Sequence, residues 1–195
     1  MLHNLSKSFQ ARLRLSLTLA LPALILSATT ATARDWQTDA AQSTLAFKGS
    51  YQGESFDGRF KKFDAAISYD EADLAEAKFD VKIDVASVDT ASDERDDSLK
   101  GDEFFDPKKF PQAHFVTTAF AKSADGTVVA QGTLTIRDQS KPVTLKVKFA
   151  ANGDKATLDV DTTLKRLDFG LGIGKDWADV GADVPVHGHL LLTGK

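Results

Sequence analysis

Three histidines offer the chemistry of metal ligands in this sequence. His187 and His189 lie two residues apart in a stretch that alternates like a β-strand, so both imidazoles point to the same face. His114 could supply a third nitrogen ligand. The other, apolar face of the stretch carries Val184, Val186, Leu190 and Leu192. The two histidines therefore face solvent, and because the chain has no cysteine to complete a site, we predict no metal centre.

Carboxylates are numerous, but their setting does not indicate catalysis. The acidic run Asp93, Glu94, Asp96 and Asp97 resembles a cluster of paired acids, yet in a short charged helix such side chains form a solvated face. The sequence contains no GxSxG, HExxH, CxxC or P-loop pattern. The glycines of GLGIGKDW (170–177) lack the strand-to-helix context of a phosphate loop and predict a rim loop that carries Trp177. We therefore predict that the protein is not an enzyme.

Residues 1–33 have the pattern of a secretory signal peptide. Lys7, Arg12 and Arg14 form a basic start, an apolar run of about 13 residues follows, and Ala31-Thr32-Ala33 supplies small residues for cleavage. A membrane anchor is the alternative, but a spanning helix needs about 20 apolar residues and Pro22 interrupts this run. We expect cleavage after Ala33, one mature domain over residues 34–195, and a periplasmic location.

The charge of the mature chain limits its partners. Of 24 Lys and Arg residues, three lie in the signal, which leaves 21 against 28 Asp and Glu, a net charge of −7. We therefore expect no nucleic-acid partner. Without cysteine the domain has neither a disulfide nor a lipoprotein acyl anchor, so it depends on its hydrophobic core.

Alternation with a period of two runs through the mature chain. In AKFDVKIDV (77–85), apolar residues alternate strictly with Lys and Asp, which predicts a strand with one dry and one wet face. Further strands are predicted at 43–51, at 55–63 running into 63–69, and at 113–121, 128–137, 142–150, 156–164 and 184–192. Turn signals such as Asn152-Gly153-Asp154 separate them, so neighbours should be antiparallel.

One segment favours a helix. In SDERDDSLKGDEFF (92–105), Ser92 or Asp93 could cap a short helix and Gly101 could end it. We expect Arg95, Asp96, Asp97 and Lys100 on its wet side. Eight or nine strands in about 160 residues fit either a closed barrel or two stacked sheets, and periodicity does not distinguish them.

Several spaced blocks carry a resemblance. The stretches SVDTASDERDDSLKGDEFFDPKKFPQAHF (87–115), QGTLTIRDQSKPVTLKVKF (131–149), LKRLDFGLG (164–172) and VGADVPVHGHLLL (180–192) resemble the YceI-like family of bacterial polyisoprenoid-binding proteins. The resemblance covers essentially the whole mature chain. It departs from the family at Ser98, where members often carry a histidine. It implies an all-β fold: an antiparallel eight-stranded lipocalin-like β-barrel with a short helix over one end and an internal apolar cavity.

A cavity of this kind needs an apolar lining, and 12 of the 16 aromatic residues after position 33 are Phe. A side chain without polar groups can line a dry interior without needing a partner. We expect the lining to comprise Phe47, Phe79, Val81, Ile83, Val85, Phe104, Phe105, Phe110, Phe115, Leu134, Ile136, Leu145, Val147, Leu158, Val160, Phe169 and Trp177.

The resemblance also implies a ligand, an isoprenoid or similar long-chain lipid such as a quinone or a polyprenyl phosphate. Arg137, Lys165 and Arg166, with Lys141 as a further candidate, are the cations expected near its head group, because Arg offers a bidentate fork to oxyanions. We expect a periplasmic binding or transport protein without another cofactor. Alternatives are an enzyme or accessory acting on such a lipid, and a structural barrel with a filled core. A homodimer and transient membrane or respiratory-protein contacts stay open.

Overall fold

The computed structural model of the chain describes residues 33–195. The expected signal peptide lies almost entirely outside the described residues. The strands are β1 (Asp35–Thr38), β2 (Thr44–Tyr51), β3 (Glu54–Phe60), β4 (Phe63–Ser68), β5 (Lys78–Asp84), β6 (Val88–Asp89), β7 (Gln112–Lys122), β8 (Val128–Ile136), β9 (Gln139–Asn152), β10 (Lys155–Lys165) and β11 (Asp183–Gly194). The helices are α1 (Asp93–Leu99) and the 3-10 turns η1 (Val85–Ser87), η2 (Arg166–Phe169) and η3 (Lys175–Trp177).

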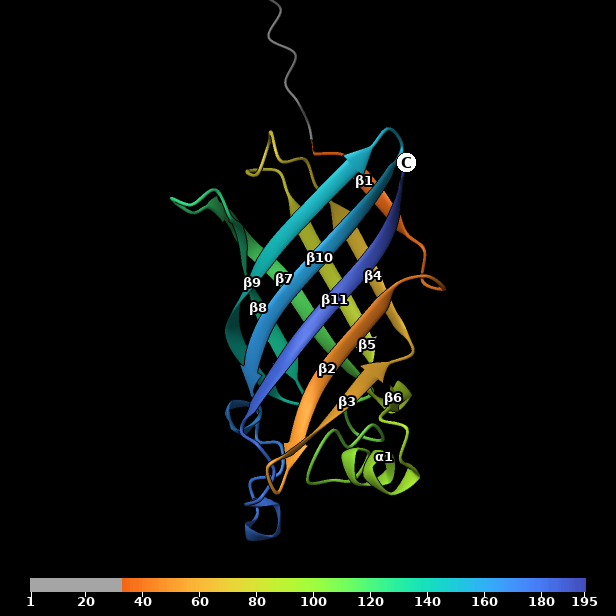
Figure 1. Cartoon of the computed structure of the whole chain (residues 1–195), viewed down its shortest axis with the longest axis vertical. Coiled ribbons are helices and arrows are strands. Elements are labelled where there is room, and N and C mark those ends of the chain that lie inside the picture. The colour runs from red at the N-terminus through yellow and green to blue at the C-terminus, as the bar shows by residue number, and fades with distance from the viewer. Residues whose placement is uncertain (1–32) are drawn as a thin grey trace, which may run out of the picture. The chain divides into compact units, whose positions relative to one another are not determined.

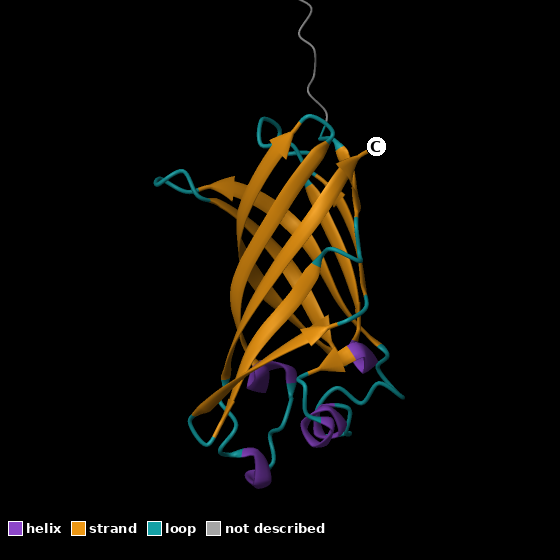
Figure 2. Ribbon diagram, turned by 45° about the vertical axis from the view of Figure 1, so that its right-hand side comes forward, coloured by secondary structure: helices purple, strands orange, loops and turns teal. Residues whose placement is uncertain are grey.

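Eight strands form a closed antiparallel barrel (Figures 1 and 2). The ring runs β1-β4-β5-β7-β8-β9-β10-β11 and closes because β11 pairs with β1. Closure removes the exposed sheet edges that a stacked pair of sheets would keep. The eight-stranded antiparallel barrel implied by the resemblance is therefore confirmed.

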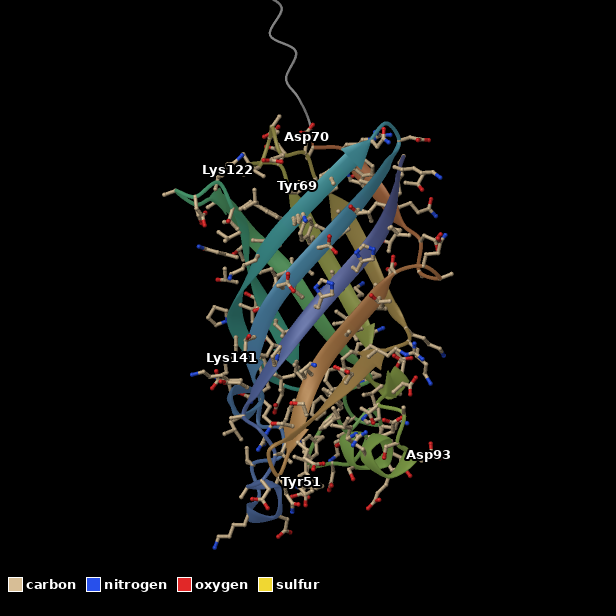
Figure 3. The ribbon with its side chains drawn as sticks, in the orientation of Figure 1. Tyr51, Tyr69, Asp70, Asp93, Lys122 and Lys141 are labelled. Atoms are coloured by element: carbon tan, nitrogen blue, oxygen red, sulfur yellow. The ribbon has the colours of Figure 1, made fainter. Side chains whose placement is uncertain are left out.

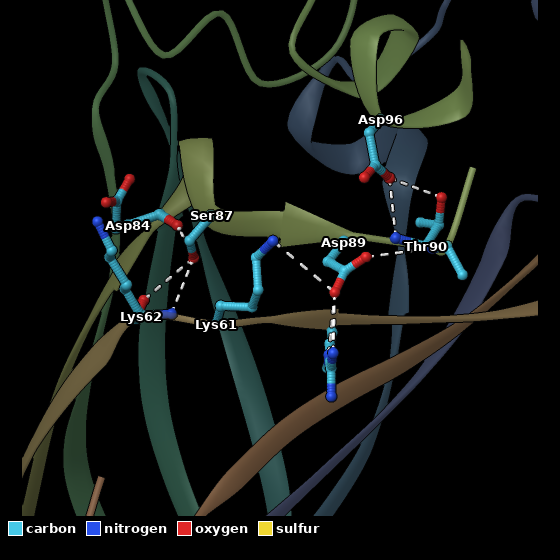
Figure 4. Close-up of polar contacts among 9 residues, drawn as sticks. Lys61, Lys62, Asp84, Ser87, Asp89, Thr90 and Asp96 are labelled. Atoms are coloured by element: carbon cyan, nitrogen blue, oxygen red, sulfur yellow. Dashed lines mark hydrogen bonds and ion pairs between the residues drawn. The ribbon is translucent and has the colours of Figure 1, made fainter. Parts of the chain in front are cut away.

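The remaining strands, β2, β3 and β6, lengthen the barrel and do not add to the number of strands around it. Along β11, residues 192–194 pair with β1 and residues 186–189 pair with β2, so β1 and β2 follow one another at the same strand position of the barrel. Likewise β3 continues into β4 across Lys61 and Lys62, and β5 continues into β6 through η1. Ser87 fixes the second junction, since its hydroxyl accepts from the Lys62 amide and donates to the Asp84 carbonyl (Figure 4). Sequence periodicity missed β1 and β6 because strands of four and two residues are too short to alternate.

The predicted short helix is confirmed as α1, at the same end of the barrel as η2 and η3, which we call the helix end (Figure 2). The Ser92 hydroxyl caps it by accepting from the Arg95 amide. The prediction that Asp96 lies on the solvent-exposed side of α1 is wrong. Asp96 is buried and accepts from both the amide and the hydroxyl of Thr90, at 2.8 and 2.6 Å (Figure 4). The Arg95 guanidinium lies 4.2 Å from the centre of the Phe56 ring, so these two side chains fasten the helix to the barrel.

The barrel interior divides into two hydrophobic clusters. One contains Val85, Phe104, Phe115, Leu134, Ile136 and Phe169 and occupies the helix end. The other contains an aromatic group that we call the aromatic plug: Trp36, Tyr69, Phe79, Phe120 and Phe149. Tyr69 lies toward the opposite end of the barrel (Figure 3). Among the described residues, no helix is long and apolar enough to cross a membrane.

Candidate functional site: an apolar cavity at the helix end

A cavity lies inside the barrel at its helix end. The centre of a water molecule can reach about 200 Å³ of it. On the same measure, a cavity that holds a single water needs only about 10–15 Å³. Its wall consists of Leu45, Phe47, Gly49, Phe56, Phe60, Val81, Ile83, Leu99, Phe104, Phe105, Ala113, Phe115, Leu134, Ile136, Val143, Leu145, Val160, Thr162, Leu164, Arg166, Phe169, Leu171, Val180, Gly181, Val184 and Val186. Only Thr162 and Arg166 contribute polar side-chain groups, so the site suits a large apolar ligand.

Aromatic rings stacked on glycines keep this space open. An eight-stranded barrel is just wide enough for side chains to fill it, so a void requires side chains that do not reach the centre. The Phe47 ring lies against Gly58 on the paired strand, and the Phe56 ring lies against Gly49. A methyl group on either glycine would lie 2.2 or 2.3 Å from the nearest ring carbon. The bare backbone therefore lets each ring lie flat on the wall.

Most of the expected lining residues lie on the cavity wall. They are Phe47, Val81, Ile83, Phe104, Phe105, Phe115, Leu134, Ile136, Leu145, Val160 and Phe169. They come from strands β2, β5, β7, β8, β9 and β10, from η2 and from the segment after α1. The alternation that predicted inward-facing side chains therefore brings these distant segments together.

Six expected lining residues lie elsewhere. Phe79, Val147 and Leu158 face inward but belong to the packed cluster beyond the cavity, because they sit one inward position further along their strands. Val85 is buried in η1 behind the wall.

The other two lie in the segments that cover the helix end. Phe110 lies beneath the Arg137 guanidinium, 5.4 Å from its centre. Trp177 packs edge-on against Phe104 at 4.8 Å and donates to Glu103 Oε2 at 2.7 Å, so it supports the wall from behind.

Sequence reasoning missed several wall residues that carry the same signal. Leu45, Val143, Leu164, Val184 and Val186 lie at alternate, apolar positions of strands that the sequence did predict. Extending each alternating face to the strand end would have found them. Leu171 and Val180 lie in the irregular segment between β10 and β11, where alternation carries no information.

Arg166 is buried and does not offer the free fork that we expected for an oxyanion. Its five N–H groups are directed at backbone carbonyls: Nε donates to Gly181, Nη1 to Leu171 and Gly172, and Nη2 to Trp177 and Val180. Burial also lowers the pKa of the guanidinium below its ordinary value. Arg166 therefore fastens the segment 171–181 over the helix end while its aliphatic part borders the cavity.

The remaining candidate cations are also not directed at the cavity. Lys165 is exposed, because it alternates with the wall residue Leu164 on β10. Arg137 donates to the Phe104 carbonyl at 3.1 Å, so it holds the segment after α1. The Lys141 side chain extends away from the barrel (Figure 3).

The histidines lie on the outer face of the barrel, each beside an aspartate of the adjacent strand. His187 Nδ1 lies 2.8 Å from Asp161 Oδ1, and His189 pairs in the same way with Asp159. His114 Nε2 lies 2.8 Å from Asp80 Oδ1, and this hydrogen bond is the main reason that the pKa of Asp80 falls below its usual range. Within residues 33–195, no group of three or more His, Cys, Asp or Glu side chains is arranged to hold a metal ion.

Similar proteins fit this architecture. A UPF0312 protein of Shewanella denitrificans is 34% identical over 179 residues, which is 86% of this chain and 94% of that protein. The crystal structure of Burkholderia cenocepacia BcnA superimposes with a TM-score of 0.75 at 34% identity, over 80% of this chain and 99% of that one. A domain from Saccharophagus degradans, described as polyisoprenoid-binding, shares the fold with a TM-score of 0.65 at 19% identity, over 82% of this chain and 98% of that one.

The match to a family of proteins is equally broad. The family model described as the YceI-like domain matches residues 36–191, from β1 to β11. This span includes most or all of each strand of the barrel and every residue of the cavity wall. The chain therefore belongs to the YceI-like family.

Proposed function

We propose that this protein binds the hydrocarbon tail of an isoprenoid lipid in the cavity at the helix end and sequesters or carries that lipid in the periplasm. The observation that carries the proposal is the wall itself, in which the only two polar side chains are Thr162 and Arg166. A wall of this composition gives an apolar chain a dry environment and gives water almost no partners. The isoprenoid class is supported by the family and by the description of the Saccharophagus degradans domain.

The affinity expected from such a wall is useful for a carrier. Burying about ten methylene groups contributes about 8 kcal/mol at about 0.8 kcal/mol each. That gross value corresponds to a Kd of about 1 μM. Ordering the chain reduces the affinity and a longer buried tail raises it. Retention of the lipid through purification therefore requires more than about ten buried methylene groups, since each further one raises the affinity by up to about fourfold.

The polar groups around the cavity favour a neutral head group. All five Arg166 donors are engaged by backbone carbonyls, and Lys165 points away from the wall. A phosphate needs several free donors, whereas a quinone head needs few. We therefore propose a quinone in preference to a polyprenyl phosphate, with its head near the helix end.

Mass spectrometry of an organic extract from natively purified protein tests the proposal. We expect a stoichiometric isoprenoid lipid from the natural chain and from Thr163→Trp, since Thr163 is exposed on β10. Val186→Trp, which places a large ring in the cavity, should lose the lipid. If the natural chain neither retains nor takes up an isoprenoid, the binding proposal fails in favour of a structural barrel. Conversion of an added lipid would instead indicate an enzyme.

A further inference from the structure

The cavity occupies only part of the barrel, because the aromatic plug closes it. Val81 and Leu145 belong to the cavity wall and also pack against the cluster that contains the plug, so they mark the boundary. One inward position beyond Val81 on β5 lies Phe79, which is 1% exposed. One inward position beyond Val160 on β10 lies Leu158, also 1% exposed. The floor of the cavity therefore consists of Val81, Leu145 and Val160, and a packed layer that contains Phe79 and Leu158 lies directly behind it.

The rings behind this floor support one another. Phe79 packs edge-on against Phe120 at 4.9 Å, and Tyr69 packs against Phe149 at 4.7 Å. Trp36 packs against Phe149 at 5.3 Å and donates to the Tyr69 carbonyl at 2.9 Å. Aromatic pairs at these separations stabilise beyond the area that they bury. A lipid tail that reached further would have to separate these rings.

The strand geometry gives the depth of the space above the floor. The wall extends from Val160 on β10 to Arg166, the first residue of η2 directly after the strand, six residues on. At about 3.3 Å per residue this is about 20 Å along the strand, and with the tilt of about 40° usual in barrels it becomes about 15 Å along the axis. That depth equals about one leaflet of a bilayer, whose hydrocarbon core is about 30 Å thick.

We propose that the aromatic plug, with Phe79 at its front, limits the length of tail that this cavity accepts. The inference rests on the proposed lipid binding and adds a selection by length. The ligand class is a lipid with a single prenyl or acyl chain about as long as one bilayer leaflet is deep. Any further part of a longer tail stays outside the cavity and adds no affinity.

Binding of a series of prenyl alcohols tests this proposal. Farnesol, geranylgeraniol and solanesol, with prenol as the short reference, compete with a fluorescent fatty acid that brightens in apolar surroundings. For the natural chain we expect affinity to rise with length, by up to about fourfold per buried methylene, and then to stay level. The tail length at which affinity stops rising should be longer in Phe79→Ala and shorter in Val160→Phe.

The outcomes separate the two proposals. If the natural chain binds none of these alcohols and no fatty acid, the proposed function itself fails. If it binds them but affinity keeps rising with every added unit, or if Phe79→Ala and Val160→Phe keep the natural length preference, the length limit is overturned. Phe110→Ala is the matched control, because this ring lies outside both the cavity and the plug, and a changed preference there would also overturn the proposal.

Folding of the variants does not decide the test. Truncating a buried Phe typically costs about 3–5 kcal/mol, so Phe79→Ala could unfold. Val160→Phe adds volume at the floor of the cavity and removes no ring of the plug. A shorter preferred tail in that variant, with cooperative thermal unfolding retained, supports the limit by itself.

Discussion

The ring of Phe47 lies against the backbone of Gly58, the residue that pairs with it across β2 and β3. The same relationship repeats between Phe56 and Gly49 two pairs away, with the positions of ring and glycine exchanged between the strands. A ring in this position covers the bare strand and leaves the centre of the barrel free. The cavity therefore depends on glycines as much as on the apolar side chains that line it.

Gly58→Ala should obstruct the cavity without unfolding the barrel. The new methyl group would meet the Phe47 ring at 2.2 Å and turn it toward the lumen. Because alanine suits a strand interior better than glycine by about 0.5–1 kcal/mol, we expect the melting temperature to hold while affinity for a fluorescent fatty acid falls at least about tenfold.

A second substitution makes room for the added methyl group. Phe47→Leu in the Gly58→Ala background should restore much of the binding. Natural affinity in Gly58→Ala, or a double variant as weak as the single one, would contradict the role of this pair.

Replacing Arg166 should affect stability more than lipid binding. Arg166→Ala leaves five backbone carbonyls without their charged donors, and each unmet buried group costs about 1–3 kcal/mol when water does not replace the bond. We expect urea unfolding to show a loss of roughly 3 kcal/mol or more. Arg166→Lys should recover only part of it, because Lys has three donors and no planar fork.

Lys165→Ala is the matched control one residue away. Its side chain is exposed on the other side of β10, so the free energy of unfolding should change by less than about 0.5 kcal/mol. If Arg166→Ala kept its stability but lost affinity for an anionic lipid alone, Arg166 would be a head-group ligand after all.

Alternation of apolar and polar residues predicts which side chains of a strand point into the barrel, but not what they meet there. Phe79, Val81 and Ile83 share one face of β5, and the period of two correctly directed all three into the barrel. It could not show that Val81 and Ile83 border a cavity while Phe79 lies in packed core. That difference depends on which residues of seven other strands reach the same level, and register is not visible in one strand.

The charged residues show the complementary limit. Sequence placed Asp96 on the wet side of α1 and Arg166 beside a ligand head group, because charged side chains are seldom buried. Both are buried, and their hydrogen-bond partners lie at positions that the alternating pattern does not indicate. Asp96 accepts from Thr90, and Arg166 donates to backbone carbonyls of a loop 5–15 residues away. The segments that contain these partners are irregular and have no periodicity, so the sequence could not predict the contacts.

Acid should weaken the fold partly through Asp80. The hydrogen bond from His114 is the largest cause that lowers the pKa of Asp80 below its ordinary value of 3.8. The unfolded chain therefore takes up this proton first as the pH falls, so the stabilising effect is complete above the ordinary carboxyl pKa and is lost below it. In urea titrations, Asp80→Asn should show a shallower loss of stability between about pH 5 and pH 1. Parallel curves for the two proteins would contradict this.

Alkali should weaken the fold through Tyr69, which stands in the aromatic plug. Burial, with Glu71 and Asp70 adding negative charge nearby, raises the pKa of its phenol from 10.0 to about 12. Above pH 10 the unfolded chain releases this proton while the folded chain keeps it, so stability is complete below pH 10 and declines as the pH rises toward 12. Urea unfolding of Tyr69→Phe should lose less stability over that interval. Tyr51→Phe is the control, because Tyr51 lies at the helix end and is 47% exposed (Figure 3). This variant should lose as much stability in alkali as the natural chain. An equal alkaline loss in all three proteins would mean that the Tyr69 phenol ionises as readily in the folded barrel as in the unfolded chain.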